Sequence, residues 1–159
     1  MIIISDTSPI TNLIQLDKLD LLQRLFTTII IPNKVYEELV VYENHRIIME
    51  SINWITVIPV SDTEKVELLK RELDAGEAEA ILLAKELNCD LLLIDERKGR
   101  EVAQSQNIKI IGLLGVLIRA KQQGFIPLLR PLLERLTNEI GFRVDRNLFE
   151  HILREVNEG

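Results

Sequence analysis

The chain has 159 residues, a mass of 18.3 kDa and 47% hydrophobic residues, so one domain spanning residues 1–159 can bury a substantial core. Its single cysteine excludes a disulfide framework and a zinc site built on cysteine pairs, and its two distant histidines argue against a histidine-rich metal site. The net charge is −6, no apolar run is long enough to span a bilayer, and the first residues lack the basic start of a secretory signal. We therefore expect a soluble, cytoplasmic protein with no membrane partner.

Short apolar runs alternate along the chain with longer segments of helical periodicity. Strands are expected at residues 2–5, 28–31, 55–58, 91–94 and 108–111, where the runs lack polar alternation and suit strands covered on both faces. Helices are expected at residues 9–26 with a break near Asp17, and at 33–42, 63–73, 77–87, 98–106, 113–123, 128–136 and 146–156. This order predicts an α/β fold with a mostly parallel sheet, to which the helices from about residue 128 are appended.

Two aspartates follow predicted strands. Asp6 comes directly after the first strand and Asp95 after the fourth, where open α/β sheets bind their ligands. Ser8 precedes Pro9 and is expected to be the N-cap of the first helix, which leaves Asp6 free to face the crevice. Asp95 is equally compatible with a cap for the helix that begins near Glu96.

Two glutamates interrupt the apolar stripes of predicted helices. Glu38 lies on the stripe of helix 33–42, and Glu77 lies on the stripe of helix 77–87. A carboxylate that faces the core is costly unless it is paired or binds a metal ion. The competing interpretations are a partly exposed stripe edge for Glu38 and a favourable partner of the helix dipole for Glu77.

Taken together, the four acids predict a metal site. Four carboxylates in one pocket repel each other unless a cation neutralises them, and a set of oxygen ligands favours Mg²⁺ or Mn²⁺. Such a pocket suits nuclease or phosphotransfer chemistry. Arg97 and Arg100 follow Asp95 closely enough to reach a substrate phosphate, although surface salt bridges would explain them as well.

The region from residue 96 to residue 135 is basic within an acidic chain. It holds eight Lys or Arg residues against three Glu residues, a net charge of +5. A local basic surface of this kind can bind a phosphate backbone. Solvated helix faces are the simpler interpretation of most of these charges.

Several segments together resemble PIN domains, in particular a VapC-like subgroup of bacterial and archaeal PIN proteins. They are residues 6–10 (DTSPI), 31–39 (IPNKVYEEL), 73–81 (LDAGEAEAI), 92–100 (LLIDERKGR) and 112–117 (GLLGVL). The resemblance covers nearly the whole chain and implies a PIN-like three-layer fold with a central sheet flanked by helices. It also implies a metal-dependent endoribonuclease, commonly the toxin of a toxin–antitoxin pair.

The resemblance assigns roles to individual residues. It maps the acidic tetrad of the family onto Asp6, Glu38, Glu77 and Asp95 as catalytic metal ligands, with Ser8 near the metal. Typical members carry Ser or Thr at the end of the fourth strand and the acid later, so Glu96 competes with Asp95 for the last position.

The same resemblance implies partners. It predicts an RNA substrate and a small antitoxin that places a basic residue in the acidic pocket. The helices from residue 128 onward would help to hold that antitoxin or a second copy of the chain, as in a homodimer. The alternative function is a catalytically silent PIN-like module that binds RNA or a protein.

Overall fold

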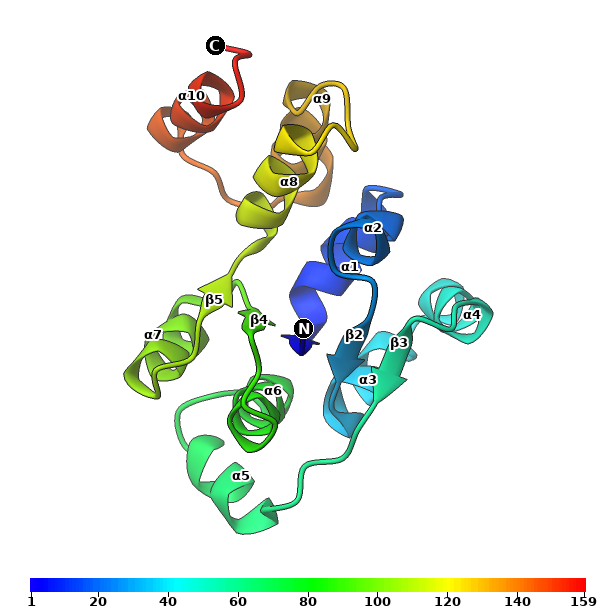
Figure 1. Cartoon of the computed structure of the whole chain (residues 1–159), viewed down its shortest axis with the longest axis vertical. Helices are drawn as coiled ribbons and strands as arrows, with labels where there is room; N and C mark the ends of the chain where they lie inside the picture. Colours follow the sequence, from blue (N-terminus) through cyan, green and yellow to red (C-terminus); the bar gives the residue numbers. More distant parts are fainter.

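Five short parallel strands form the centre of the molecule in a computed structural model that describes residues 1–159 (Figure 1). The sheet order is β3-β2-β1-β4-β5, and every neighbouring pair is parallel. The strands are β1 (Ile3–Ser5), β2 (Ile29–Ile31), β3 (Ile55–Val57), β4 (Leu91–Leu93) and β5 (Ile110–Ile111). All five predicted strands are present, and the predicted α/β class with a parallel sheet is confirmed.

Helices connect the strands and cover both faces of the sheet. They are α1 (Thr7–Gln15), α2 (Asp20–Phe26), α3 (Asn33–Leu39), α4 (Glu43–Ser51), α5 (Thr63–Leu69), α6 (Ala75–Glu86), α7 (Arg97–Ser105), α8 (Leu113–Gln122), α9 (Arg130–Arg135) and α10 (Arg146–Glu155). A π-helix, η1 (Leu136–Ile140), continues α9 and ends at Gly141, which has a left-handed φ of 81°. None of these helices is both long and apolar enough to cross a membrane.

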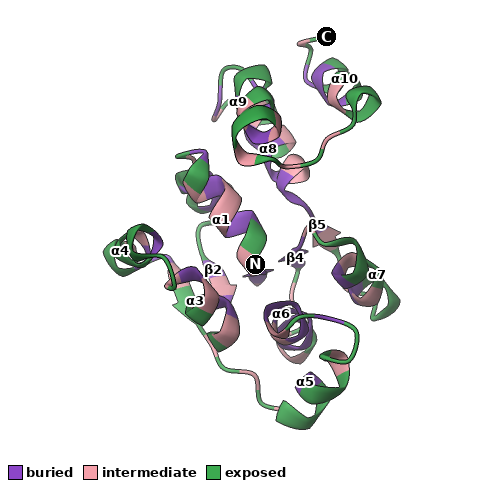
Figure 2. Ribbon diagram, turned by 180° about the vertical axis from the view of Figure 1, so that it is seen from behind, coloured by how far each residue is buried: buried purple, intermediate pink, exposed green.

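Alternate residues of the strands point into two separate cores. Ile3 and Leu91 belong to the larger core, which the side chains of α1, α2, α8, α9 and α10 complete. Ile4 and Leu92 belong to the smaller core under α5, α6 and α7. Figure 2 shows α6 almost fully buried between the sheet and its neighbours, whereas α4, α7 and α10 have exposed outer faces. The apolar, non-alternating strand sequences follow from this burial on both faces.

The helices differ from the sequence prediction at several of their ends and in one whole helix, α4. The first helix begins at Thr7, so Asp6 and not Ser8 occupies the N-cap position, and Asp6 makes no capping hydrogen bond with its side chain. Helix α4 was not predicted, because its charged sequence has only two buried side chains, His45 and Met49.

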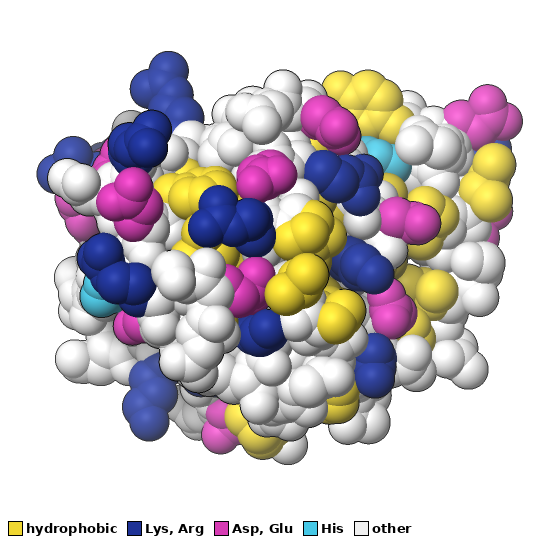
Figure 3. Space-filling view, turned by 90° about the horizontal axis from the view of Figure 1, so that it is seen from above, with side chains coloured by type: hydrophobic (Ala, Val, Ile, Leu, Met, Phe, Trp, Pro, Cys, Tyr) yellow, Lys and Arg dark blue, Asp and Glu magenta, His cyan; other side chains and the backbone are white.

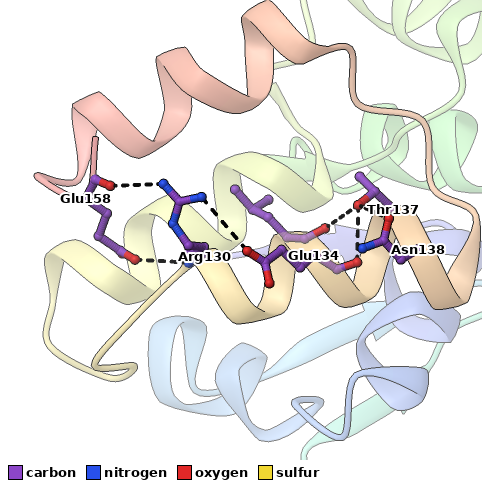
Figure 4. Close-up of polar contacts among 6 residues, drawn as sticks. Arg130, Glu134, Thr137, Asn138 and Glu158 are labelled. Atoms are coloured by element: carbon purple, nitrogen blue, oxygen red, sulfur yellow. Dashed lines mark hydrogen bonds and ion pairs between the residues drawn. The ribbon is translucent and has the colours of Figure 1, made fainter.

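The C-terminal helices are fastened together by Glu158. Its carboxylate accepts hydrogen bonds from the backbone N–H groups of Leu129 (2.7 Å) and Arg130 (3.0 Å) at the start of α9. It also pairs with the Lys121 ammonium group of α8 at 3.3 Å. Figure 4 shows Arg130 held between Glu158 and Glu134, with Thr137 and Asn138 further along the same helix. The end of the chain is therefore an integral part of the domain.

Candidate active site

The register of the parallel strands brings two aspartates to the same edge of the sheet. Ser5 of β1 lies opposite Leu93 of β4, and the backbone N–H of Asp6 donates to the Leu93 carbonyl at 2.9 Å. Asp6 and Asp95 therefore follow neighbouring strands at their carboxyl ends, as in other parallel sheets that bind ligands there.

An acidic pocket of about 300 Å³ opens at this edge. Its lining is wholly polar, with five carboxylic acids and no basic residue. The lining residues are Asp6, Thr7, Ser8, Thr11, Asn12, Glu38, Asp74, Glu77 and Glu96. Three of the four acids predicted to form the tetrad, Asp6, Glu38 and Glu77, thus meet in one cavity, although 32 and 39 residues separate them in the sequence.

Glu38 reaches the pocket from α3, as its position on the apolar stripe predicted. The Thr7 hydroxyl donates to Glu38 Oε1 at 2.6 Å and so holds the carboxylate at the N-terminus of α1. Glu37, one residue earlier, is exposed and lies 3.6 Å from Lys34. The N-terminus of α3 is tied to α6, since Glu79 accepts a hydrogen bond from the Lys34 amide at 3.1 Å.

Glu77 enters the pocket as part of a capping box at the start of α6. The Glu77 amide donates to Asp74 Oδ1 at 2.8 Å, and the Asp74 amide donates to Glu77 Oε1 at 3.3 Å. The second carboxylate oxygen, Oε2, is buried without a hydrogen-bond partner. Both interpretations of Glu77 therefore hold. Its Oε1 takes part in the capping box at the start of α6, and its Oε2 is the buried carboxylate oxygen that faces inward.

Glycines make room for the carboxylates. A Cβ atom at Gly76 would overlap Glu38 Oε1, and one at Gly99 would come within 2.7 Å of Glu77 Oε2. A Cβ at Gly112 would come within 2.8 Å of Asp95 Oδ1. Three of the predicted acids thus lie against a backbone that carries no side chain.

Burial and crowding raise the pKa values of these acids. Burial raises the pKa of Asp6 to about 7, with repulsion from Asp74, Glu38 and Asp95 adding to the rise. The pKa of Glu77 is also raised, first by burial and then by its hydrogen bond to Asp74 and by the charges of Asp74 and Asp6. Because these surroundings disfavour the ionised carboxylates, a bound cation, which favours the ionised form, would be stabilising in this pocket.

Comparison with known families decides what kind of domain this is. A family model described as a PIN domain matches residues 2–158. The chain belongs to the PIN-domain family. No curated protein and no solved structure matches it.

PIN domains are generally nucleases that use divalent metal ions, and the residues of this PIN domain suit such an ion. The donors are all carboxylate oxygens, which Mg²⁺ and Mn²⁺ prefer, and Glu77 Oε2 is a buried oxygen without a partner. No three of the acids lie close enough to enclose an ion as they stand. Mg²⁺ does not require such a cage, because it keeps several water ligands and binds through one or two carboxylates.

Two neighbouring residues, Asp95 and Glu96, are candidates for the fourth acid of this PIN domain, and they line different cavities. Glu96 lines the acidic pocket, whereas Asp95 lies in the next cavity along the sheet edge. Asp95 Oδ1 accepts a hydrogen bond from the Leu113 amide at 2.8 Å, so Asp95 holds the start of α8 and not the start of α7. Its Oδ2 is buried without a partner. Burial raises the pKa of Asp95, while the Leu113 amide and Arg100 oppose the rise.

The remaining predicted site residues of the PIN domain, Ser8, Arg97 and Arg100, lie in three different places. Ser8 lines the acidic pocket from the first turn of α1. Arg97 points away from it: its side chain is 92% exposed and lies 3.2 Å from Glu101 on the outer face of α7. Arg100 lies beside Asp95 in the adjoining cavity. The structure thus brings Arg100 to the sheet edge but leaves Arg97 at the surface.

Four residues that line the acidic pocket were not predicted from the sequence: Thr7, Thr11, Asn12 and Asp74. Two of them orient a predicted ligand: the Asp74 amide donates to Glu77 Oε1, and the Thr7 hydroxyl donates to Glu38 Oε1. Asp74 had a local signal, since Asp followed three residues later by Glu is the spacing of a capping box. Thr7 had none, because its partner is 31 residues away.

Proposed function

We propose that this PIN domain is a Mg²⁺- or Mn²⁺-dependent endoribonuclease of the VapC-like toxin type. The observation that carries the proposal is the pocket of five carboxylic acids without a basic residue, at the carboxyl edge of a parallel sheet. In the free protein the acids of such a pocket repel each other. A bound divalent cation would neutralise them and would also bind the phosphate of a substrate. An RNA nuclease of this type would act in the cytoplasm.

The residues divide into ligands and positioning groups. Asp6, Glu38 and Glu77, together with Asp95 or Glu96, would hold the ion, one or two of them directly and the others through its water ligands. When bound, Mg²⁺ or Mn²⁺ supplies an activated water and charge neutralisation for an in-line displacement at phosphorus, which leaves a 5′-phosphate and a 3′-hydroxyl. The Thr7 hydroxyl keeps Glu38 turned toward the pocket, and the Asp74 backbone amide keeps the Glu77 carboxylate there. Ser8 lies where its hydroxyl can contact the substrate or a metal-bound ligand.

A toxin-type nuclease requires restraint, and the pocket suggests how a partner would supply it. An antitoxin segment that inserts a Lys or Arg would neutralise the five acids and take the place of the ion. We further propose that the C-terminal helices α8, α9 and α10 help to hold that antitoxin or a second copy of the chain as a homodimer.

The test is cleavage of a structured RNA with added Mn²⁺. We expect cleavage that EDTA abolishes and that Asp6→Asn and Glu38→Gln reduce at least a hundredfold, as is usual for loss of a group that stabilises transition-state charge. Glu37→Gln is the matched control, because Glu37 lies on the same helix, is exposed and pairs only with Lys34. Cleavage that survives Glu38→Gln as well as it survives Glu37→Gln would contradict the proposal.

A calorimetric titration with Mn²⁺ distinguishes the enzyme from a catalytically silent module that binds RNA or protein. The enzyme is expected to bind the ion in the micromolar to millimolar range and to lose binding in Glu77→Gln. A protein that folds normally but binds no Mn²⁺ at millimolar concentration would be the silent module.

A further inference from the structure

A second cavity lies beside the acidic pocket on the same edge of the sheet. It has a volume of about 450 Å³ and opens at the carboxyl ends of β4 and β5. Asp95, Arg100 and Gly112 form its inner side. Phe142 and Arg143, which precede α10, and Leu148 in the first turn of α10 form its outer side. The proposed nuclease chemistry uses none of this outer side.

The charge of this cavity is opposite to that of its neighbour. It holds two guanidinium groups, Arg100 and Arg143, and a single carboxylate, Asp95, which already accepts the Leu113 amide. Arg143 is exposed and has no ion pair or hydrogen bond within the chain. The acidic pocket next to it has five carboxylic acids and no basic group.

Free basic side chains are scarce elsewhere in the basic region. Five of its eight Lys and Arg residues are already paired with acids: Arg97, Lys98, Lys121, Arg130 and Arg135. Figure 3 shows the result at the end formed by the C-terminal helices, where basic and acidic side chains intermingle around small hydrophobic areas. The face shown in Figure 3 carries no broad basic surface. Arg100 and Arg143 make no ion pair within the chain, and both line the cavity beside Asp95.

The remaining lining is apolar and partly aromatic. Half of the ten lining residues are hydrophobic, and the ring of Phe142 is only partly buried. A cavity with one guanidinium group on its inner side, and a second guanidinium group and a partly buried ring on its outer side, matches the two parts of a nucleotide, a phosphate and a base. Gly112 contributes room, because a Cβ there would come within 2.7 Å of Arg100 Nη1.

We infer that this cavity binds the nucleotide adjacent to the scissile phosphate of a single-stranded RNA. Arg100 and Arg143 would hold the neighbouring phosphate, and the base would rest on Phe142, which a paired base could not reach. The inference rests on the proposed nuclease function, since the acidic pocket marks where the scissile phosphate and its cation would sit. An acidic peptide would satisfy the arginines as well, but it would leave the aromatic side unused.

RNA binding in EDTA tests the inference without any cleavage. The probe is a fluorescein-labelled decauridine, and its affinity is measured by anisotropy over a series of salt concentrations. One phosphate contact to a single strand contributes about 0.7 to the slope of log K against log salt, or roughly an eightfold affinity difference at about 50 mM salt. Arg143→Gln is expected to show both losses, and Phe142→Ala is expected to weaken binding with the slope unchanged.

Arg146→Gln is the matched control. Arg146 lies only three residues after Arg143, its side chain is 90% exposed, and its guanidinium group lies 3.3 Å from the Glu150 carboxylate. Equal slopes in Arg143→Gln and Arg146→Gln would overturn the inference, even in an active nuclease. Decaglutamate that competes with decauridine equally well, and loses affinity in Arg143→Gln to the same extent, would assign the cavity to acidic peptides instead. A slope difference in a protein that fails to cleave RNA with Mn²⁺ would support the subsite and refute the nuclease.

Discussion

Asp6 is held in the pocket at a cost that the metal-free protein cannot avoid. The residue is 5% exposed, and burial raises its pKa to about 7. In the unfolded chain the same group titrates near 4. Between these two values the folded protein binds the proton more tightly, so the stability that Asp6 contributes is complete at low pH and is lost as the pH rises toward 7.

Asp6→Asn is therefore expected to raise the melting temperature of the metal-free protein at pH 8 by several degrees and to leave it nearly unchanged at pH 4. One pKa unit corresponds to about 1.4 kcal/mol, and one kcal/mol shifts the midpoint of a domain of this size by roughly 2–4 °C. Mg²⁺ should stabilise the wild type more than the variant. The measurement is a thermal melt across pH with and without Mg²⁺, and a lower midpoint for Asp6→Asn at pH 8 would exclude a repulsive pocket.

Gly76 offers a different test of the same site, because the lack of a side chain there leaves room for Glu38. Gly76→Ala places a methyl group against Glu38 Oε1 and forces that flexible carboxylate out of the pocket. Alanine is also the better helix former, so we expect an unchanged or slightly higher melting temperature. Mn²⁺ binding and RNA cleavage should fall together. Full activity in Gly76→Ala would show that the position of Glu38 is not required.

At the scale of the element, the start of α6 combines a structural and a functional role. Asp74 caps the helix through the Glu77 amide, and its charge also raises the pKa values of Glu77 and Asp6. These two contributions to stability have opposite signs: the cap stabilises α6, while the charge opposes the other acids.

Two substitutions of Asp74 separate these contributions. Asp74→Ala removes the cap and is expected to lower the free energy of unfolding by about 1 kcal/mol. Asp74→Asn keeps an oxygen that can accept from the Glu77 amide and removes the charge, so its stability at pH 8 without metal should equal or exceed that of the wild type. Chemical denaturation of both variants measures the difference. Equal destabilisation by both would show that charge repulsion is negligible at this helix end.

At the scale of the whole molecule, Glu158 joins the end of the chain to the core helices. Its side chain is only 7% exposed, and burial alone would raise its pKa. The amides of Leu129 and Arg130 and the Lys121 ammonium group outweigh burial, so that the pKa of Glu158 is lowered. The stability from this contact is therefore present above the unfolded pKa of about 4.3 and is lost as the pH falls below it.

Glu158→Gln is expected to loosen α10 at neutral pH, because the amide cannot pair with Lys121 and cannot accept from both α9 amides as strongly. Hydrogen exchange of the α10 amides should become faster, and the wild type should approach the same rates as the pH is lowered toward 3. Glu155→Gln is the control, since Glu155 pairs only with His151 on the helix surface at 3.4 Å. Equal exchange in both variants would show that Glu158 does not fasten the helix.

The sequence by itself determined the parallel α/β sheet and the chain positions of its acids. Runs such as 91–94 have no polar alternation, which only a strand buried on both faces tolerates, and the order of strands and helices then sets the crossovers. Glu38 and Glu77 were found as acids on apolar stripes because helical periodicity is a local property. Helix α4 was not found, since its amphipathic character rests on two side chains and emerges only from packing.

The tertiary structure decided how the acids meet. Thr7 contacts Glu38 across 31 positions, and Asp95 contacts the Leu113 amide across 18, so no local spacing predicts either pair. After β4, Glu96 lines the acidic pocket, whereas Asp95 lines the cavity that also contains Arg143. Local sequence sets which face of an element a side chain occupies, whereas its partner depends on which elements pack there, and that is decided by burial of the two cores as a whole.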